Sequence, residues 1–248
     1  MSDTMDAWLF DLGNTRLKAA PLRADGRLGP VLALPWQDGI EAGLSEHLPA
    51  RFEAAYVASV AGEPVRLALL DALTRRARRI SLARTQAAAL GVRVAYAQPQ
   101  RLGVDRFLAL AAARARGGDA LVCGVGTALT LDLLDADGRH HGGCIAPSPT
   151  LMREALHARA PQLPVAGGEA VDFAVSTEDG LASGCEGAAL ALIEQRLAAA
   201  HARLGRAPAL LLHGGGADAL RPRLPQARPA PHLVLEGLAI WAAVETSR

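Results

Sequence analysis

The sequence is poor in several residue types, and each shortage argues against a class of protein. Lysine occurs once, at Lys18, and aromatic residues make up only 4% of the 248 residues. The formal net charge is +1, so no net field recruits nucleic acid or an anionic membrane. The arginine cluster Arg75, Arg76, Arg78 and Arg79 lacks interleaved aromatic residues for base stacking. We interpret it as a solvated helix face and expect no nucleic-acid partner.

Cysteine and long apolar runs are also scarce. Cys123, Cys144 and Cys185 are widely spaced and form no CxxC or Cys/His pattern, which argues against a disulfide scaffold or a zinc site. The first residues are acidic where a signal peptide would be basic. No stretch of about eighteen apolar residues follows. We therefore expect a cytoplasmic protein with no membrane segment.

The sequence has the composition of an ordinary globular protein. Half of its residues are hydrophobic and 21% are charged, which suits a well-packed core and not a disordered chain. The length allows one large α/β domain or two smaller ones. Size alone does not choose between them.

Two short segments repeat the same pattern. Residues 7–10 are apolar, residues 11–15 form a polar turn with Gly13, and an alternating pattern resumes at residues 17–20, which predicts a β-hairpin. Residues 120–123 lead in the same way into the turn at residues 124–127 and a returning strand at residues 129–134. The repeat predicts an internal duplication with halves at residues 1–117 and 118–248.

The remaining patterns alternate between strand and helix. We predict strands at residues 55–60, 92–96 and 209–213. Helical spacing is seen at residues 64–90, 105–116, 149–160, 180–203 and 233–246. Residues 142–147 suit either a plain turn or a close approach to a ligand, and the proline-rich residues 222–231 predict a surface loop.

The first turn carries groups that suit phosphate and metal. Asp11 ends a strand and is followed by Gly13, Asn14 and Thr15. A carboxylate offers hard oxygen to Mg²⁺, and a glycine lets backbone amides approach phosphates. The same residues favour any tight turn. The second turn, with Gly126 and Thr127, makes the ligand-binding reading more specific, since two glycine turns can hold a triphosphate from both sides.

Asp105 and Arg106 form a second group with chemical potential. Asp105 stands at a predicted helix start, where the helix dipole and a guanidinium favour its ionised form. It is either a helix cap or a base that orients a hydroxyl nucleophile. Arg106 can bind an anionic substrate group through its planar fork.

A third glycine turn follows the predicted strand at residues 209–213. Gly214, Gly215 and Gly216 would let a nucleotide lie against the backbone. The sequence has neither a GxGxxG fingerprint nor a GxxxxGK[ST] motif, so no dinucleotide-binding or Walker-type site is supported. His140, His141 and His213 lack carboxylates at ligand spacing, and we interpret them as surface or packing residues.

Taken in order, these motifs resemble those of type III pantothenate kinases, members of the acetate-kinase, sugar-kinase, heat-shock-protein and actin superfamily. The resemblance spans nearly the whole chain. It rests on residues 11–15, Tyr96 and Pro99 before residues 103–106, residues 126–128 with Thr130 and Asp132, residues 142–143 with Ile145 and Pro147, Thr177 with Gly184, residues 214–216 and residues 235–238.

The resemblance implies an α/β fold of two ribonuclease-H-like, actin-like ATPase domains with the active site in the cleft between them. It further implies a homodimer and the phosphorylation of pantothenate by ATP, the first step of coenzyme A synthesis. Required cations would be Mg²⁺, held by Asp11, and a monovalent cation, K⁺ or NH₄⁺.

The resemblance also implies roles for single residues, with Asp105 as the catalytic residue. The substrate would contact Tyr96, Gly103, Val104, Asp105, Arg106 and Thr177. ATP would contact Asp11, Leu12, Gly13, Asn14, Thr15, Arg16, Leu17, Lys18, Gly126, Thr127, Gly214 and Gly215.

The chain departs from the family pattern at two positions. Gly124 stands where the family usually has aspartate in Asp-x-Gly-Thr, which removes a cation ligand. Either the monovalent-cation site is altered, with weaker or shifted K⁺ dependence, or nucleotide affinity falls. Ser148 follows Pro147 where the family usually has glycine. Two alternatives stay open: a kinase for another small hydroxy acid, and a kinase-like regulatory or accessory protein with reduced or no catalysis.

Overall fold

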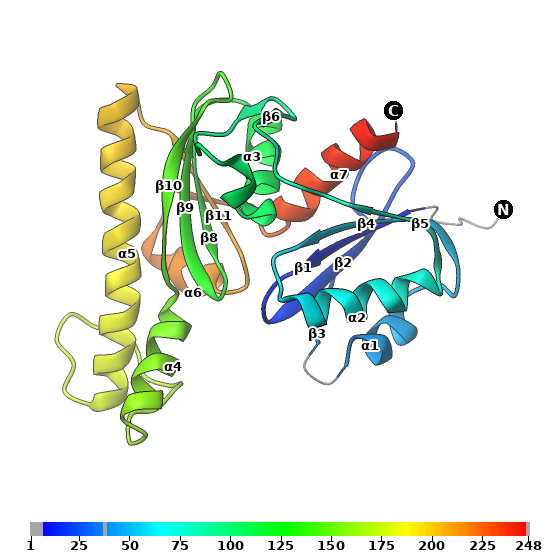
Figure 1. Ribbon diagram of the computed structural model, residues 1–248. Helices are drawn as coiled ribbons and strands as arrows, with labels where there is room; N and C mark the ends of the chain where they lie inside the picture. Colours follow the sequence, from blue (N-terminus) through cyan, green and yellow to red (C-terminus); the bar gives the residue numbers. More distant parts are fainter. Residues whose placement is uncertain (1–6, 37–38, 247–248) are drawn as a thin grey trace. The chain divides into compact units, whose positions relative to one another are not determined.

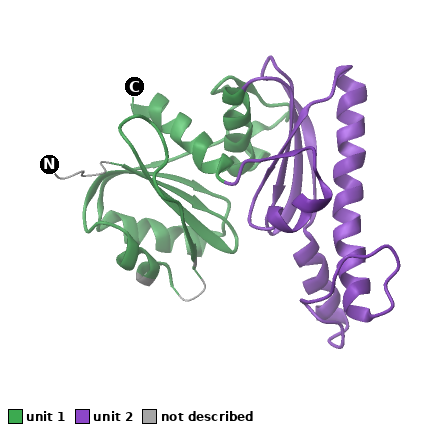
Figure 2. Ribbon diagram, turned by 180° about the vertical axis from the view of Figure 1, so that it is seen from behind, with its two compact units in different colours: residues 1–116, 232–248 green, residues 117–231 purple. Residues whose placement is uncertain are grey.

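The structure, a computed structural model, describes residues 7–36 and 39–246. The expectation about a signal peptide concerns the first residues, of which 1–6 lie outside this range. The chain divides into one unit of residues 1–116 and 232–248 and a second unit of residues 117–231, coloured separately in Figure 2. The first boundary lies within one residue of the division predicted at residues 117 and 118. The predicted second half differs, because residues 232–248 group with the first unit.

The first unit is built on a mixed sheet of strand order β3-β2-β1-β4-β5 (Figure 1). Antiparallel pairing joins β1 to β2 and β2 to β3, whereas β4 runs parallel to both β1 and β5. The strands are β1 (Ala7–Leu12), β2 (Arg16–Leu22), β3 (Leu32–Pro35), β4 (Phe52–Ser59) and β5 (Ala77–Leu82).

The second unit repeats this topology in the order β10-β9-β8-β11-β12. Two antiparallel pairs are again followed by two parallel pairs. The strands are β8 (Ala120–Val125), β9 (Ala128–Leu134), β10 (His140–Pro147), β11 (Ala209–His213) and β12 (Ala227–Pro229). The two sheets thus share strand order and directions, as an internal duplication would produce.

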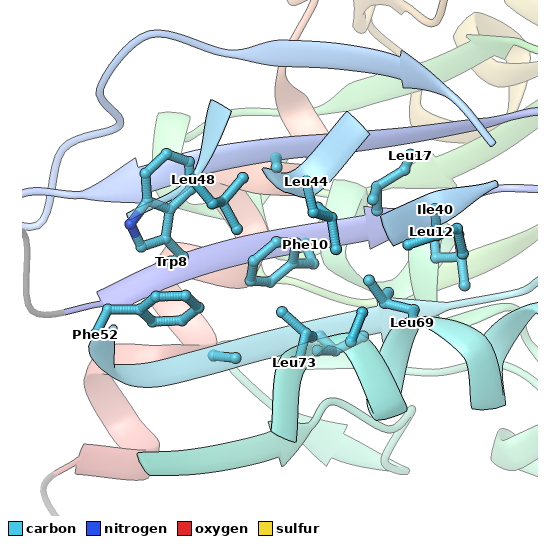
Figure 3. Packing of buried hydrophobic residues seen from close by; sticks show 14 of the residues in the cluster. Trp8, Phe10, Leu12, Leu17, Ile40, Leu44, Leu48, Phe52, Leu69 and Leu73 are labelled. Carbon is cyan, nitrogen blue, oxygen red and sulfur yellow. The ribbon is translucent and has the colours of Figure 1, made fainter. Parts of the chain in front are cut away.

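One face of the first sheet packs against α1 (Ile40–His47) and α2 (Glu63–Thr74). Alternate residues of β1, Trp8, Phe10 and Leu12, point into this layer, as a strand's period of two requires. They meet Leu44 of α1 and Leu69 of α2, and Figure 3 shows these side chains interleaved. Burying each large apolar side chain stabilises the fold by about 1.5–3 kcal/mol.

Two helices that are distant in sequence also belong to the first unit. These are α3 (Val104–Arg116) and α7 (Leu233–Thr246), which pack closely against each other. A Cβ atom on Gly237 would lie 1.9 Å from the carbonyl oxygen of Leu108, so only glycine allows this approach. Trp241 of α7 packs edge-on against Tyr56 of β4, with ring centroids 6.1 Å apart. These contacts explain why residues 232–248 group with the first unit.

The core of the second unit lies between its sheet and α5 (Thr177–Leu204). Cys123 and Val125 of β8 face Ala189 and Ile193 of the helix. The helix α4 (Pro149–Arg159) begins after Ser148, whose hydroxyl accepts a hydrogen bond from the backbone of Leu151. The remaining short elements are β6 (Ala88–Ala89), β7 (Val92–Arg93), η1 (Pro99–Arg101), α6 (Ala217–Leu220) and η2 (Arg221–Arg223).

The prediction of a helix over residues 64–90 is wrong beyond Thr74. Residues 77–82 instead form β5, which hydrogen-bonds in parallel to β4. Pairing with a buried strand overrides the local helical spacing. The arginine cluster is therefore not a helix face: Arg78 lies 3.6 Å from Glu53, and Arg79 donates a hydrogen bond to the Tyr56 hydroxyl.

Other predictions need smaller corrections. The strand predicted at residues 92–96 covers only Val92–Arg93. The predicted loop at residues 222–231 includes the edge strand β12, and residues 142–147 lie in β10 instead of a turn. Gly124 and Val125 belong to β8, so the second turn is shorter than predicted. Within the described range, no helix is long and apolar enough to cross a membrane.

Candidate active site

The first glycine turn joins β1 to β2 in the first unit. The backbone N–H of Gly13 donates to the carbonyl of Arg16 at 3.0 Å, which closes the turn. The indole Nε1 of Trp36 donates to the Gly13 carbonyl at 3.2 Å. Asn14 and Thr15 are exposed at the tip. Trp36 thus fixes the backbone of the turn, while the side chains of Asn14 and Thr15 remain accessible to a ligand.

Asp11 is the most perturbed acidic group of this turn. It pairs across the hairpin with Lys18. The pKa of Asp11 is raised to about 7, mainly by burial and also by the nearby charge of Asp105, while the charge of Lys18 opposes the shift. Asp11 and Asp105 are therefore close enough for their charges to repel. A pair of interacting carboxylates is an arrangement that a divalent cation relieves.

Asp105 lies in the first turn of α3 and is joined to its predicted partners. Its Oδ1 accepts a hydrogen bond from the backbone N–H of Arg106 at 2.8 Å. The Arg106 guanidinium donates to the Tyr96 hydroxyl at 3.2 Å and lies over the tyrosine ring, 5.9 Å from its centroid. Tyr96, Asp105 and Arg106 thus form one polar cluster in the first unit.

Gly103 lies directly beside the Asp105 carboxylate. A Cβ atom at Gly103 would lie 2.5 Å from Oδ1 of Asp105. The Gly103 carbonyl also accepts the N–H of Phe107 as α3 begins. The adjacent Val104 is buried, as is Arg106 with 8% of its surface exposed. A buried guanidinium is costly unless it is paired, so its position is set by specific partners.

The second glycine turn joins β8 to β9 in the second unit. The N–H of Gly126 donates to the carbonyl of Ala128 at 2.9 Å, and both Gly126 and Thr127 are exposed. The turn closes a hairpin as the first does, with two residues between the strands instead of three.

The third glycine turn packs directly behind the end of β8. Gly214 has φ of +96°, and a Cβ there would lie 2.3 Å from the Val125 carbonyl oxygen. The N–H of Gly216 donates to that same oxygen at 2.9 Å. The second unit thus brings Gly126 and Thr127 close to Gly214 and Gly215 at the carboxyl ends of β8 and β11. Ligands of open α/β sheets bind at such ends.

The predicted site residues divide between the units. The first unit holds Asp11 to Lys18 and the cluster around Asp105, and the second holds the other two glycine turns and Thr177. Leu12 and Leu17 are buried in the core, so neither presents a side chain to a ligand. Thr177 is exposed at the first position of α5, next to the capping Ser176. Within the described residues, no group of three or more His, Cys, Asp or Glu side chains could hold a metal.

Sequence reasoning missed two residues near these turns. Trp36, which supports Gly13, follows a short strand with no clear sequence signal. His213 is a packing residue, as one of the two interpretations expected, but the contact of its ring with Gly124 was not predicted. The signal for His213 was its place at the end of β11, immediately before three glycines.

The family model described as type III pantothenate kinase matches residues 8–199. The chain belongs to this family. Type III pantothenate kinases from Stenotrophomonas maltophilia strain K279a and Xylella fastidiosa strain M23 are 58% and 54% identical to it. These alignments cover 96% and 97% of this chain and 98% of each relative. The predicted family is thereby confirmed.

Two solved structures are similar in fold. One is described as a Baf family transcriptional activator from Campylobacter jejuni, with a TM-score of 0.66 and 19% identity over 97% of this chain and all of the other. The second is described as a 2-dehydro-3-deoxygalactonokinase from Sinorhizobium meliloti, with a TM-score of 0.58 and 18% identity over 97% of this chain and 99% of the other. Both support the predicted α/β fold class, and neither by itself indicates a substrate.

Proposed function

We propose that this chain is a pantothenate kinase that transfers the γ-phosphate of ATP to the terminal hydroxyl of pantothenate, yielding 4'-phosphopantothenate and ADP. Membership in the family supports this most directly. Asp11 and Asp105, whose charges interact, supply the two carboxylates that the chemistry needs. The product is the one expected from the first step of coenzyme A synthesis.

Mg²⁺ fits the residues around the first turn. Mg²⁺ is commonly bound by one or two carboxylates together with substrate phosphates and water. Asp11 would hold it, and Lys18 on the paired strand would add positive charge near the phosphates. When bound, Mg²⁺ neutralises charge on the phosphates of ATP. The residues of the three glycine turns, 13–16, 126–127 and 214–215, would bind ATP mainly through backbone N–H groups.

The cluster around Asp105 would bind and orient the alcohol. Arg106 would pair with the pantothenate carboxylate, and Tyr96 would keep the guanidinium in place. Asp105 would accept a hydrogen bond from the hydroxyl and take its proton as the oxygen bonds to phosphorus. The bond from phosphorus to the ADP oxygen breaks in the same step. Gly103, Val104 and Thr177 would complete the substrate contacts.

The homodimer and the cytoplasmic location remain parts of this proposal. Apolar side chains are strongly exposed in the segment between α4 and α5, where Phe173 is 95% exposed and Val175 fully exposed. Val165 and Val171 of the same segment are also exposed. Proteins seldom leave such groups of apolar residues in water. We assign this segment to contact with a second copy.

A coupled assay of ADP release, with and without pantothenate, tests the proposal. We expect release that depends on MgATP and on pantothenate together. Asp105→Asn should keep the melting temperature and lower kcat by about 10²–10⁴-fold, the usual contribution of a general base. Wild-type turnover in this variant would remove Asp105 from the mechanism.

Two alternatives are separated by the same assay. A panel of other small hydroxy acids under identical ATP conditions identifies a different acceptor. A regulatory or accessory role would give ATP binding with no transfer to any hydroxylated acceptor. The name of the Campylobacter jejuni structure is the observation that keeps this second candidate in view.

A further inference from the structure

His213 and Gly124 are neighbours at the carboxyl end of the second sheet. They are register partners on the parallel strands β11 and β8, and Gly124 is also the register partner of Thr130 on β9. Register partners project their side chains to the same face of a sheet. His213, Gly124 and Thr130 therefore form one row across three strands, directly before the second and third glycine turns.

The His213 ring fills the space that a side chain at position 124 would need. A Cβ atom on Gly124 would lie 2.9 Å from Nε2 and 3.0 Å from Cε1 of His213. The same atom would lie 2.7 Å from Oγ1 of Thr130. Because such separations are below normal contact, any larger residue at 124 would have to displace the imidazole or the hydroxyl. Gly124 and His213 are thus matched to each other.

This row does not fit a monovalent cation held by residue 124. Gly124 has no side-chain oxygen, and the space beside it holds an imidazole. Alkali cations, as hard ions, are expected to favour oxygen ligands, whereas imidazole suits transition metals. An imidazole nitrogen can instead donate a hydrogen bond to an anion such as phosphate.

We propose that His213 contacts the phosphates of the nucleotide at the second glycine turn, and that this contact replaces the monovalent cation there. The proposal rests on the proposed function for the identity of the nucleotide. His213 is the last residue of β11 and immediately precedes Gly214, which packs on Val125 two residues before Thr127. Its imidazole thus lies next to the ends of the strands from which the second and third glycine turns begin.

Two measurements on the full chain, nucleotide affinity and turnover, test the proposed contact of His213 with the phosphates. The dissociation constant of the magnesium complex of a non-hydrolysable ATP analogue is measured by calorimetry in a tetramethylammonium buffer, with and without 100 mM K⁺. We expect K⁺ to change the wild-type affinity and kcat by less than about twofold. His213→Ala should weaken binding about 10-fold to 100-fold, the effect of losing a hydrogen bond to a charged group.

Matched variants separate a specific contact from loss of packing. His201→Ala removes an exposed histidine from α5 of the same unit and should bind the analogue like the wild type. His213→Gln, which keeps a donor, should recover part of the lost affinity. The double variant Gly124→Asp, His213→Ala gives room for a carboxylate and should become activated by K⁺. Melting temperatures show whether each variant is folded.

The outcomes distinguish this inference from the proposed function. Normal analogue binding by folded His213→Ala, or activation of the wild type by K⁺ of tenfold or more, would overturn the inference and leave the kinase assignment intact. If pantothenate is not phosphorylated but analogue binding depends on His213 and not on K⁺, the inference holds and the proposed function fails.

Discussion

At the scale of single residues, the raised pKa of Asp11 makes the stability of the free protein depend on pH. Its pKa is raised from 3.8 to about 7 because the carboxyl is buried near Asp105. Between these pH values the folded chain binds a proton that the unfolded chain has lost, so this group lowers stability as pH rises. Such strain is common where a site is built to hold a cation or substrate.

Replacing Asp11 with asparagine should therefore stabilise the free protein at alkaline pH. The expected gain is small near pH 4, grows until about pH 7 and is constant above, reaching a few kcal/mol at roughly 1.4 kcal/mol per pKa unit. Thermal unfolding of wild type and Asp11→Asn from pH 4 to pH 8, without nucleotide, measures it. Asp172→Asn, which removes an exposed carboxylate, controls for net charge. If Asp11→Asn and the wild type differ in stability by the same amount at every pH, the raised pKa of Asp11 does not affect stability.

The same variant should lose magnesium-dependent turnover, since an amide is a weaker ligand than a carboxylate. For the wild type, the protonated form below about pH 7 should also need more Mg²⁺. The Mg²⁺ concentration for half-maximal rate should thus fall as pH rises from 6 to 8. If the Mg²⁺ concentration for half-maximal rate does not vary with pH, Asp11 does not bind the Mg²⁺ ion.

At the scale of elements, the closest backbone approach between α3 and α7 depends on one glycine. A methyl group on Gly237 would overlap the Leu108 carbonyl, so Gly237→Ala should separate the helices and cost about 1–3 kcal/mol. Gly187→Ala is the matched control, because a Cβ at this α5 position meets nothing within 4 Å among the described residues. That control should gain about 0.5–1 kcal/mol from helix propensity.

Urea unfolding curves of both variants and the wild type measure these changes. We expect Gly237→Ala to lower the midpoint and Gly187→Ala to leave it equal or raise it. A neutral Gly237→Ala would mean that α7 shifts along α3 at no cost, contrary to a close-packed contact.

The success of sequence reasoning also varied between elements for physical reasons. Both hairpins were predicted because apolar runs flanked turn residues such as Gly13, so local signals agreed with the fold. The strand β5 was missed because its arginines carry no alternating pattern and its pairing with β4 is distant in sequence. Likewise, only the tertiary contact of Gly237 with Leu108 places α7 in the first unit.

The candidate site followed the same rule. Asp105 and Arg106 could be recognised from their place at a helix start, and the structure joins them to Tyr96. The contact of His213 with Gly124 could not be predicted, because it depends on a parallel strand pair that spans 89 positions of sequence. Sequence patterns reveal local turns, and the sheet register decides which side chains share a face.

At the scale of the whole molecule, the duplicated topology explains why glycine turns recur. Each half begins with a hairpin whose turn lies beside the carboxyl end of a parallel strand pair. The halves then diverge: the first keeps Asp11 in its hairpin, and the second has Gly124 with His213. The first half thus carries a carboxylate at its glycine turn, whereas the second half carries an imidazole there.

The exposed apolar residues between α4 and α5 lead us to expect a dimer in solution. Sedimentation should give twice the chain mass of 25.8 kDa, because a second copy would remove Phe173 and Val175 from water. Phe173→Ser combined with Val175→Ser should shift the equilibrium towards monomer, since each buried large apolar side chain contributes about 1.5–3 kcal/mol. Val244→Ser, at an exposed position of α7, should leave the mass unchanged. A double variant that sediments like the wild type would place the subunit contact on another surface.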